Sequence, residues 1–311
     1  MALNTATFIK EKTEEIKRVV KERRALVALS GGVDSMTAAF LTHRAVGKNL
    51  VALFLDDGLM REGEVKDTAD FLAEKKIELQ VWDVQKAFFE ALRGRTDPED
   101  KRKAFRDVFY RTLGQAVKSY SADVMVQGTI AADIVETQKG IKTQHNVLSQ
   151  AGVNPALFGL KVLEPLKTLY KDDVRKVAKA LGLPRKHYER KPFPGPALAA
   201  RIIGEVTPER VEKVRLATAI VEEELKAPSI FQALAVLMND RATGIVDGKR
   251  LLGEIIVIRA VESKNALTAK PCKLTWPVLE SVRDKILKRV PGVVKVLYDI
   301  TPKPPSTIEY I

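Results

Sequence analysis

The sequence is poor in the residues that build several common kinds of site. It contains one cysteine, Cys272, and only three histidines. A single cysteine excludes an internal disulfide and a zinc site made of several cysteines, and it removes chemistry that needs a cysteine pair. The flanking residues Pro271 and Lys273 do not form the Gly-x-Cys-x-Gly turn that activates a glutamine-hydrolysing cysteine.

Long apolar runs are absent as well. No stretch approaches the roughly 18 to 20 apolar residues that cross a bilayer. Residues 1–24 are charged and amphipathic, which is not the pattern of a signal peptide. We therefore expect a cytoplasmic protein with no membrane partner.

Basic residues outnumber acidic ones, with 52 Lys and Arg against 40 Asp and Glu, so the formal net charge is +12. This excess favours polyanionic ligands, although a charge excess is more often a solvated surface, or a nucleotide pocket together with Lys and Glu enrichment, than a nucleic-acid footprint. We rank a nucleotide ligand above nucleic acid and do not expect a nucleic-acid partner.

The first part of the chain alternates between short apolar runs and amphipathic segments. Such alternation predicts a parallel sheet with helices on both faces. The expected strands are 25–29, 50–55, 77–82, 123–127 and 161–163, and the expected helices are 33–45, 64–76, 84–92, 98–120 and 171–181. Residues 128–160 show little periodicity and are too long for an ordinary connection, so we expect them to form a lid loop.

The prolines of residues 192–196 interrupt regular structure and indicate a domain boundary. Beyond them the pattern predicts a smaller α+β domain. Its expected helices are 208–226 and 276–289, and its expected strands are 233–237, 254–261 and 293–300. We therefore divide the chain into domains 1–192 and 193–311.

One loop carries a specific chemical signal, since Ser30-Gly31-Gly32-Val33-Asp34-Ser35 lies between the first strand and the first helix of the alternating region. Backbone amides at a helix N-terminus bind phosphate, glycines allow close approach, and serine hydroxyls add donors. Asp34 is suited to hold Mg²⁺ against the phosphates. The loop lacks the Gly-x-x-x-x-Gly-Lys-Ser/Thr pattern, so γ-phosphate chemistry is not indicated. A tight turn that needs glycines for steric reasons is the alternative.

This loop resembles the pyrophosphate loop of the N-type ATP pyrophosphatases, which have an α/β fold like that of the adenine nucleotide alpha-hydrolases. Other segments, in order along the chain, are similar to one branch of that group, the GMP synthetases, and in particular to their separate synthetase subunit. These segments are 54–61, 127–130, 141–147, 163–166, 192–196, 204–207, 298–300 and 303–309.

The resemblance implies a carbon–nitrogen ligase that uses ATP and Mg²⁺. Xanthosine monophosphate (XMP) would be aminated to GMP through an adenylyl-XMP intermediate, with release of AMP and pyrophosphate. Ammonia would come from a separate glutamine amidotransferase subunit, and the second domain would form a homodimer and complete the substrate site.

The resemblance also implies roles for individual residues. Ser30, Gly31, Gly32, Val33, Asp34 and Ser35 would bind the pyrophosphate of ATP, with Asp34 as the metal ligand, and Leu55 and Gly128 would lie near adenine. Asp133, Glu136, Lys142 and His145 would be catalytic residues of the lid. Gln232, Lys295, Lys303, Ile308 and Glu309 would bind the nucleotide substrate, with Glu309 on a strand over 306–310.

Several of these assignments have alternatives. Asp133 and Glu136 are also consistent with one exposed face of a helix, and 303–309 with an ordinary edge strand. The lid departs from the family pattern, because Gln144 replaces the first of two histidines and 148–150 replaces a Gly-Gly-Leu-Pro turn. Alternative functions are a related ligase acting on another nucleotide or RNA, and a nonenzymatic nucleotide- or RNA-binding protein.

Overall fold

The computed structural model describes residues 3–138, 160–263 and 266–311, and it divides into two compact units. The first unit comprises Met1–Asp57, Gly63–Val84 and Arg106–Arg190, and the second comprises Gly58–Glu62, Gln85–Phe105 and Lys191–Ile311. The chain crosses from the first unit to the second for the last time between Arg190 and Lys191, next to the expected domain boundary at residue 192. The second unit also contains 58–62 and 85–105, which the sequence analysis assigns to the first domain.

The first unit contains a five-stranded parallel sheet, as predicted. Its strands are β1 (Ala25–Leu29), β2 (Leu50–Asp56), β3 (Leu79–Asp83), β4 (Val124–Val126) and β5 (Lys161–Leu163). The strand order is β3-β2-β1-β4-β5. The chain therefore adds β2 and β3 on one side of β1 and then β4 and β5 on the other side. Ligands of such sheets bind at the carboxyl ends of the strands where the order reverses. The loops that follow β1 and β4 lie at this point.

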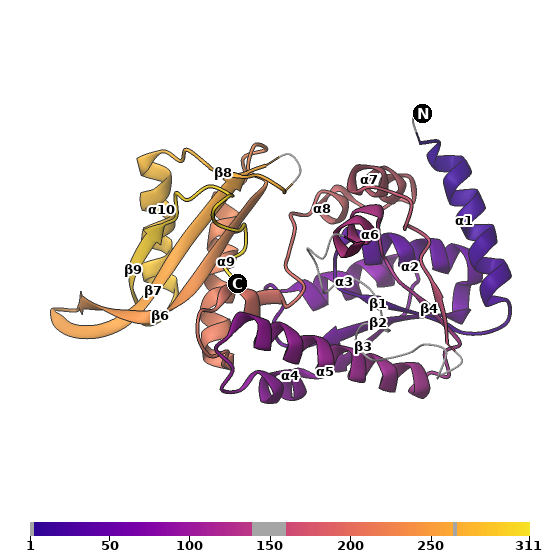
Figure 1. Cartoon of the computed structure of the whole chain (residues 1–311), viewed down its shortest axis with the longest axis horizontal. Coiled ribbons are helices and arrows are strands. Elements are labelled where there is room, and N and C mark those ends of the chain that lie inside the picture. Colours follow the sequence, from indigo (N-terminus) through magenta and orange to yellow (C-terminus); the bar gives the residue numbers. More distant parts are fainter. Residues whose placement is uncertain (1–2, 139–159, 264–265) are drawn as a thin grey trace. The chain divides into compact units, whose positions relative to one another are not determined.

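Helices cover both faces of this sheet (Figure 1). The helices that begin in this unit are α1 (Thr5–Val20), α2 (Val33–Val46), α3 (Glu64–Glu74), α6 (Ala131–Gln138), α7 (Lys171–Ala180) and α8 (Arg185–Tyr188). Helix α2 packs on β1, and α1 and α7 pack on α2. No helix among the described residues is both long and apolar enough to cross a membrane.

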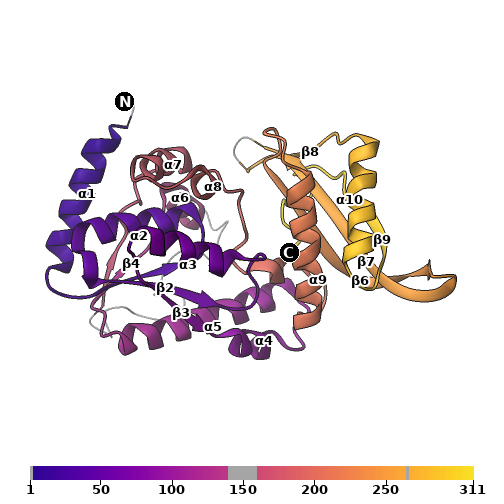
Figure 2. The ribbon, with the colours of Figure 1, turned by 180° about the vertical axis from the view of Figure 1, so that it is seen from behind.

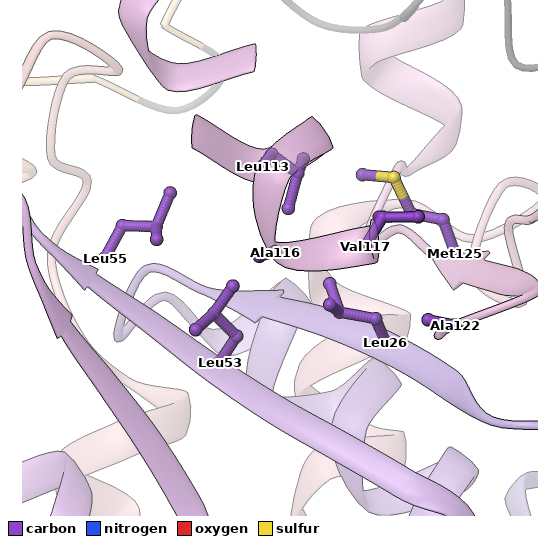
Figure 3. Close-up of a cluster of buried hydrophobic side chains, with 8 residues drawn as sticks. All are labelled: Leu26, Leu53, Leu55, Leu113, Ala116, Val117, Ala122 and Met125. Atoms are coloured by element: carbon purple, nitrogen blue, oxygen red, sulfur yellow. The ribbon is translucent and has the colours of Figure 1, made fainter. Parts of the chain in front are cut away.

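The opposite face is covered by the part of α5 (Pro98–Ser119) that belongs to the first unit. Figure 3 shows the buried side chains that meet there. Leu26, Leu53, Leu55 and Met125 come from the strands, and Leu113, Ala116 and Val117 come from α5. Because alternate residues of a strand point to opposite faces, Leu53 and Leu55 share this core. Leu55 therefore has a packing role, while its proximity to adenine stays a prediction.

The second unit has a smaller, mixed sheet with helices on one face, which confirms the predicted α+β class. Its elements are α4 (Gln85–Leu92), α9 (Pro208–Glu224), β6 (Gln232–Val246), β7 (Lys249–Glu262), β8 (Lys270–Pro271), α10 (Trp276–Arg289) and β9 (Val293–Tyr298). Strands β6 and β7 form an antiparallel hairpin, and β9 pairs in parallel with β7. Figure 2 shows α9 and α10 side by side over the sheet, where α9 packs on β6 and α10 on β9.

The hairpin is longer than the sequence predicts. Asp247 and Gly248 form its turn with positive φ angles of 50° and 75°, a pattern typical of two-residue hairpins. The Asp-Gly pair is the sequence signal that identifies this turn.

The expected strand over 306–310 is wrong, because the structure has bends and irregular backbone there. A fully buried arginine, Arg259 of β7, holds this segment instead. Its guanidinium donates hydrogen bonds to Asp299 Oδ2 (2.6 Å) and to the carbonyl oxygens of Thr301 (2.9 Å), Thr307 (2.7 Å) and Ile308 (3.0 Å). Side-chain donors from β7 thus replace the backbone ladder that a strand would have supplied.

Candidate functional site

The loop after β1 has the geometry of an anion site. Gly31 has a φ of +69°, and a Cβ placed on it would overlap Glu64 Oε1, so only glycine fits. Gly32 is the N-cap of α2, with Val33 as the first helical residue. The Ser35 hydroxyl donates to the carbonyl of Gly32 (3.1 Å) and accepts from the Ser30 amide (3.3 Å), which closes the loop around the helix N-terminus.

Gly128 follows β4 and closes the other side of this site. A Cβ at Gly128 would lie 2.8 Å from the backbone carbon of Asp34 and the amide nitrogen of Ser35. The lack of a side chain at this position therefore lets the two loops meet at the N-terminus of α2. This contact explains the glycine, while its proximity to adenine stays a prediction.

The two carboxylate oxygens of Asp34 differ in their contacts. Lys171 Nζ lies 2.5 Å from Asp34 Oδ2, whereas Oδ1 is buried and has no hydrogen-bond partner among the described residues. In the described part of the chain, no three His, Cys, Asp or Glu side chains gather as a metal-binding group. Mg²⁺ commonly binds through one or two carboxylates and substrate phosphates. Asp34 therefore fits a Mg²⁺ ion that arrives with a nucleotide.

Sequence analysis missed Lys171, the first residue of α7. A cation is disfavoured at a helix N-terminus because the helix dipole is positive there. Asp172 and Asp173 follow in the same turn and offset this cost. A lysine at an unfavourable position directly before two carboxylates is the signal that could have identified it.

The four predicted lid residues are placed only in part. Asp133 and Glu136 both belong to α6, and Asp133 Oδ2 accepts a hydrogen bond from the Ile130 amide (3.0 Å). This contact caps the start of the helix and gives Asp133 a structural role. Lys142 and His145 lie outside the described residues, so the catalytic roles of all four stay predictions.

Three of the predicted substrate residues come together in the second unit. Arg201 donates to both oxygens of Glu309 (Nε to Oε2 3.2 Å, Nη2 to Oε1 3.1 Å), and Gln232 Nε2 donates to Oε1. Ile308 packs beside them on Val261 and Ala269. The carboxylate remains partly accessible, because the Glu309 side chain is 20% exposed.

The two predicted lysines of the substrate site are placed differently. Lys303 pairs through its backbone with Ala269, a neighbour of Ile308 in the core, and its Nζ donates to the carbonyl of Ala266 (2.8 Å). Lys295 is exposed on β9, in register with Ile255. Their substrate contacts stay predictions.

Arg201 is a second residue that sequence analysis missed. It is fully buried, and its guanidinium lies 4.9 Å from the Phe193 ring, which Arg61 approaches at 4.0 Å. A buried arginine requires a partner. Arg201 stands within the apolar stretch 197–203, and Arg259 follows the apolar run 255–258. A charge inside an apolar run is therefore the signal that points to both anchors.

The remaining nucleophile and imidazole candidates are structural. Burial raises the pKa of the Cys272 thiol to about 11, so it is not a thiolate near neutral pH. His187 is buried and stacks on Phe71 with ring centroids 4.4 Å apart, and burial lowers the pKa of its imidazole. For Cys272 this agrees with the sequence analysis, which found no activating turn around it.

Two family models match the chain. The model described as NAD synthase matches residues 5–198, and the model described as GMP synthase C terminal domain matches residues 219–310. The first part of the chain therefore has an ATP pyrophosphatase fold, and the second part is a domain characteristic of GMP synthases.

Several curated proteins match over almost their full length, and each is named as one subunit of a glutamine-hydrolyzing GMP synthase. The protein from Methanopyrus kandleri is 48% identical, with 97% of this chain and 98% of the relative covered. The proteins of the same name from Pyrococcus furiosus and Archaeoglobus fulgidus are 47% and 46% identical, covering 97% and 99% of this chain and 96% and 100% of the relatives. The phosphate loop, the two matching models and near-complete coverage by these relatives lead to one conclusion: the chain belongs to the family of GMP synthase synthetase subunits.

Proposed function

We propose that the chain performs the synthetase half-reactions of GMP synthesis, and that the phosphate loop with the Asp34–Lys171 pair is the observation that carries this assignment. The 2-oxygen of XMP attacks the α-phosphorus of ATP, the bond between α-phosphorus and bridging oxygen breaks, and pyrophosphate leaves. Ammonia then attacks carbon 2 of the purine, the carbon–oxygen bond breaks, and AMP leaves with that oxygen. Loss of protons from the added nitrogen gives GMP.

The chain's part in the first step is to bind the negative charge that moves onto pyrophosphate. The amides at the N-terminus of α2 and the hydroxyls of Ser30 and Ser35 donate hydrogen bonds to phosphate oxygens, and Lys171 supplies a positive charge beside them. Asp34 would hold Mg²⁺, and the ion would neutralise further phosphate charge. The α-phosphate thereby becomes accessible to a weak oxygen nucleophile.

In the second unit, Glu309 accepts hydrogen bonds from purine N–H groups, and the Arg201 fork sets its orientation. Gln232 and Ile308 line the same place, and we assign Lys303 and Lys295 to the oxygens or phosphate of XMP. Asp133, Glu136, Lys142 and His145 are assigned to the reacting atoms. ATP and nucleoside monophosphates are cytoplasmic metabolites, so we place the reaction in the cytoplasm.

Two partners belong to this proposal. Ammonia is supplied by a separate glutaminase subunit, since Cys272 is buried and its thiol stays protonated. A second copy of the chain docks through the second unit, where Ile245 and Leu252 are 77% and 61% exposed on the outer part of the hairpin. Their strand register places both on one face.

The test is pyrophosphate release from ATP, Mg²⁺ and ammonium with XMP, IMP, AMP or RNA as the acceptor. We expect release with XMP only, and its loss in Asp34→Ala. Asp70→Ala, which removes an exposed carboxylate of α3, is the matched control and should keep wild-type turnover. Release that depends on RNA or on another nucleotide, or wild-type turnover in Asp34→Ala, would overturn the assignment.

A further inference from the structure

An ion pair whose carboxylate is buried lies against the phosphate loop. Glu64, the first residue of α3, has a side chain that is only 2% exposed, and its Oε1 lies 2.8 Å from Nη1 of Arg190. Arg190 follows α8 closely in the chain, so the pair joins two distant segments of the first unit. Neither residue belongs to the loop that the sequence motif identifies.

Gly31 packs on this pair. Arg190 Nη1 donates to the carbonyl oxygen of Gly31 (3.3 Å), and a Cβ on Gly31 would lie 3.0 Å from that nitrogen. In a trans peptide the carbonyl and the following N–H point in opposite directions. By holding the Gly31 carbonyl, Arg190 turns the amide of Gly32 away from the pair and toward the opposite side of the loop.

The charge of the pair matters as much as its geometry. A carboxylate in contact with Gly31 would repel the polyphosphate of ATP, and a buried carboxylate charge is costly without a cation beside it. The guanidinium of Arg190 offsets that charge and also holds the loop. Glu64 in turn fixes the guanidinium, because a buried carboxylate and an arginine form a directional pair.

We propose that Arg190 and Glu64 are positioning residues for the phosphate loop, acting as a neutral support that orients its peptides toward the β- and γ-phosphates of ATP. This inference rests only on the ATP-binding part of the proposed function. It requires no nucleotide acceptor, so its test is independent of XMP.

The test compares binding of MgATP and AMP to the full chain by calorimetry, with thermal unfolding as the check on folding. Arg190→Met leaves the Glu64 carboxylate beside the loop without the guanidinium, and we expect MgATP to bind about ten- to a hundredfold more weakly, as for the loss of one charged contact. AMP lacks the β- and γ-phosphates and should bind within about threefold of wild type. A general distortion of the unit would weaken both ligands together.

A charge rescue makes the test specific. Adding Glu64→Gln to Arg190→Met removes the carboxylate charge and should recover a large part of the lost MgATP affinity. The matched control is Arg185→Met, because Arg185 and Glu189 form an exposed pair at α8 (2.6 Å) that does not touch the loop. This control should leave both affinities unchanged.

Arg190→Lys is the second variant if Arg190→Met does not fold. It keeps the positive charge but loses the several N–H donors of the guanidinium group, so we expect an intermediate loss of MgATP affinity and normal AMP binding. Wild-type MgATP affinity in a folded Arg190→Met or Arg190→Lys variant would overturn the inference, as would the absence of charge rescue. Normal MgATP binding by the wild-type chain without XMP-dependent pyrophosphate release would overturn the proposed function alone.

Discussion

Arg201 and Glu309 form a two-point hydrogen-bonded ion pair in which the arginine is fully buried and the carboxylate is not. Two nearly parallel hydrogen bonds fix the plane of a carboxylate as well as its position. The Glu309 carboxylate is therefore held in one preset orientation, which would reduce the entropy lost when the proposed XMP ligand binds.

Glu309→Gln should raise the KM for XMP roughly ten- to a hundredfold, because one charged hydrogen bond contributes about 1.5 to 3 kcal/mol. The KM for ATP should barely change, since the phosphate loop belongs to the first unit. Steady-state pyrophosphate release measures both constants. Glu262→Gln, an exposed glutamate at the end of β7, is the control and should behave as wild type.

Arg201→Lys should affect the KM for XMP through the Glu309 carboxylate, which Arg201 holds in place. We expect its effect on the KM for XMP to be much smaller when Glu309 is already glutamine, because the two residues form one pair. Additive effects in this double-mutant cycle, in folded proteins, would contradict a shared role.

Lys171→Met should lower turnover and should also lower the Mg²⁺ concentration needed for half-maximal activity. Removing the cation weakens stabilisation of the leaving pyrophosphate, so we expect kcat to fall by about 100-fold, as for other single transition-state donors. Asp34 loses a competing positive charge, so half-maximal activity should require less Mg²⁺. Lys167→Met, an exposed change just before α7, serves as the control; unchanged kcat in Lys171→Met would argue against a role at the phosphates.

The exposed face of the hairpin gives a test of the proposed homodimer. Burial of each large aliphatic side chain contributes about 1.5 to 3 kcal/mol, so a double Ile245→Glu, Leu252→Glu variant should be monomeric at micromolar concentration. Light scattering measures the mass. Leu287→Glu, on the exposed side of α10, should leave the assembly unchanged. A wild-type monomer with full activity would exclude the dimer as a functional requirement.

His187 should make the first unit less stable in acid. Its unfolded imidazole takes up a proton near pH 6.5, whereas burial lowers the pKa in the folded chain. The unfolded state therefore binds more protons below pH 6.5, and stability falls from there toward the lower folded pKa. His187→Phe keeps the stack on Phe71 and removes the titration, so the wild-type melting temperature should fall more steeply between pH 7 and 5 than that of the variant. An equally steep fall in both proteins would assign the acid sensitivity to other groups.

The phosphate loop is predictable from sequence because its signals are local. The apolar run 25–29, the two glycines and the helix that starts at Val33 lie within a few residues of one another, and each requires the same turn. The parallel sheet follows from the same alternation of short apolar runs and helices.

The tail and the outer hairpin are less predictable because long-range contacts decide them. Residues 306–310 carry a strand-like pattern, yet Arg259 supplies their hydrogen bonds from a distant strand. The outer half of β6 has exposed residues on both faces, so it lacks the alternation that identifies a half-buried strand. The inclusion of 58–62 and 85–105 in the second unit likewise depends on packing that no local pattern encodes.

The contacts of Arg259 have a consequence for how the protein is made. Every hydrogen-bond acceptor described for its guanidinium lies in residues 299–308. Until those residues leave the ribosome, the Arg259 side chain in the middle of β7 has none of these acceptors. The first unit ends at Arg190, so all of its residues emerge before these acceptors and can begin to fold while synthesis continues. The second unit also needs residues translated much earlier, and it is closed by residues 299–308, which emerge after its strands. Ribosome stalling before residues 299–308 emerge would thus leave a chain with a formed phosphate loop and an unfinished second unit, a species that chaperones and proteases would recognise by its exposed sheet.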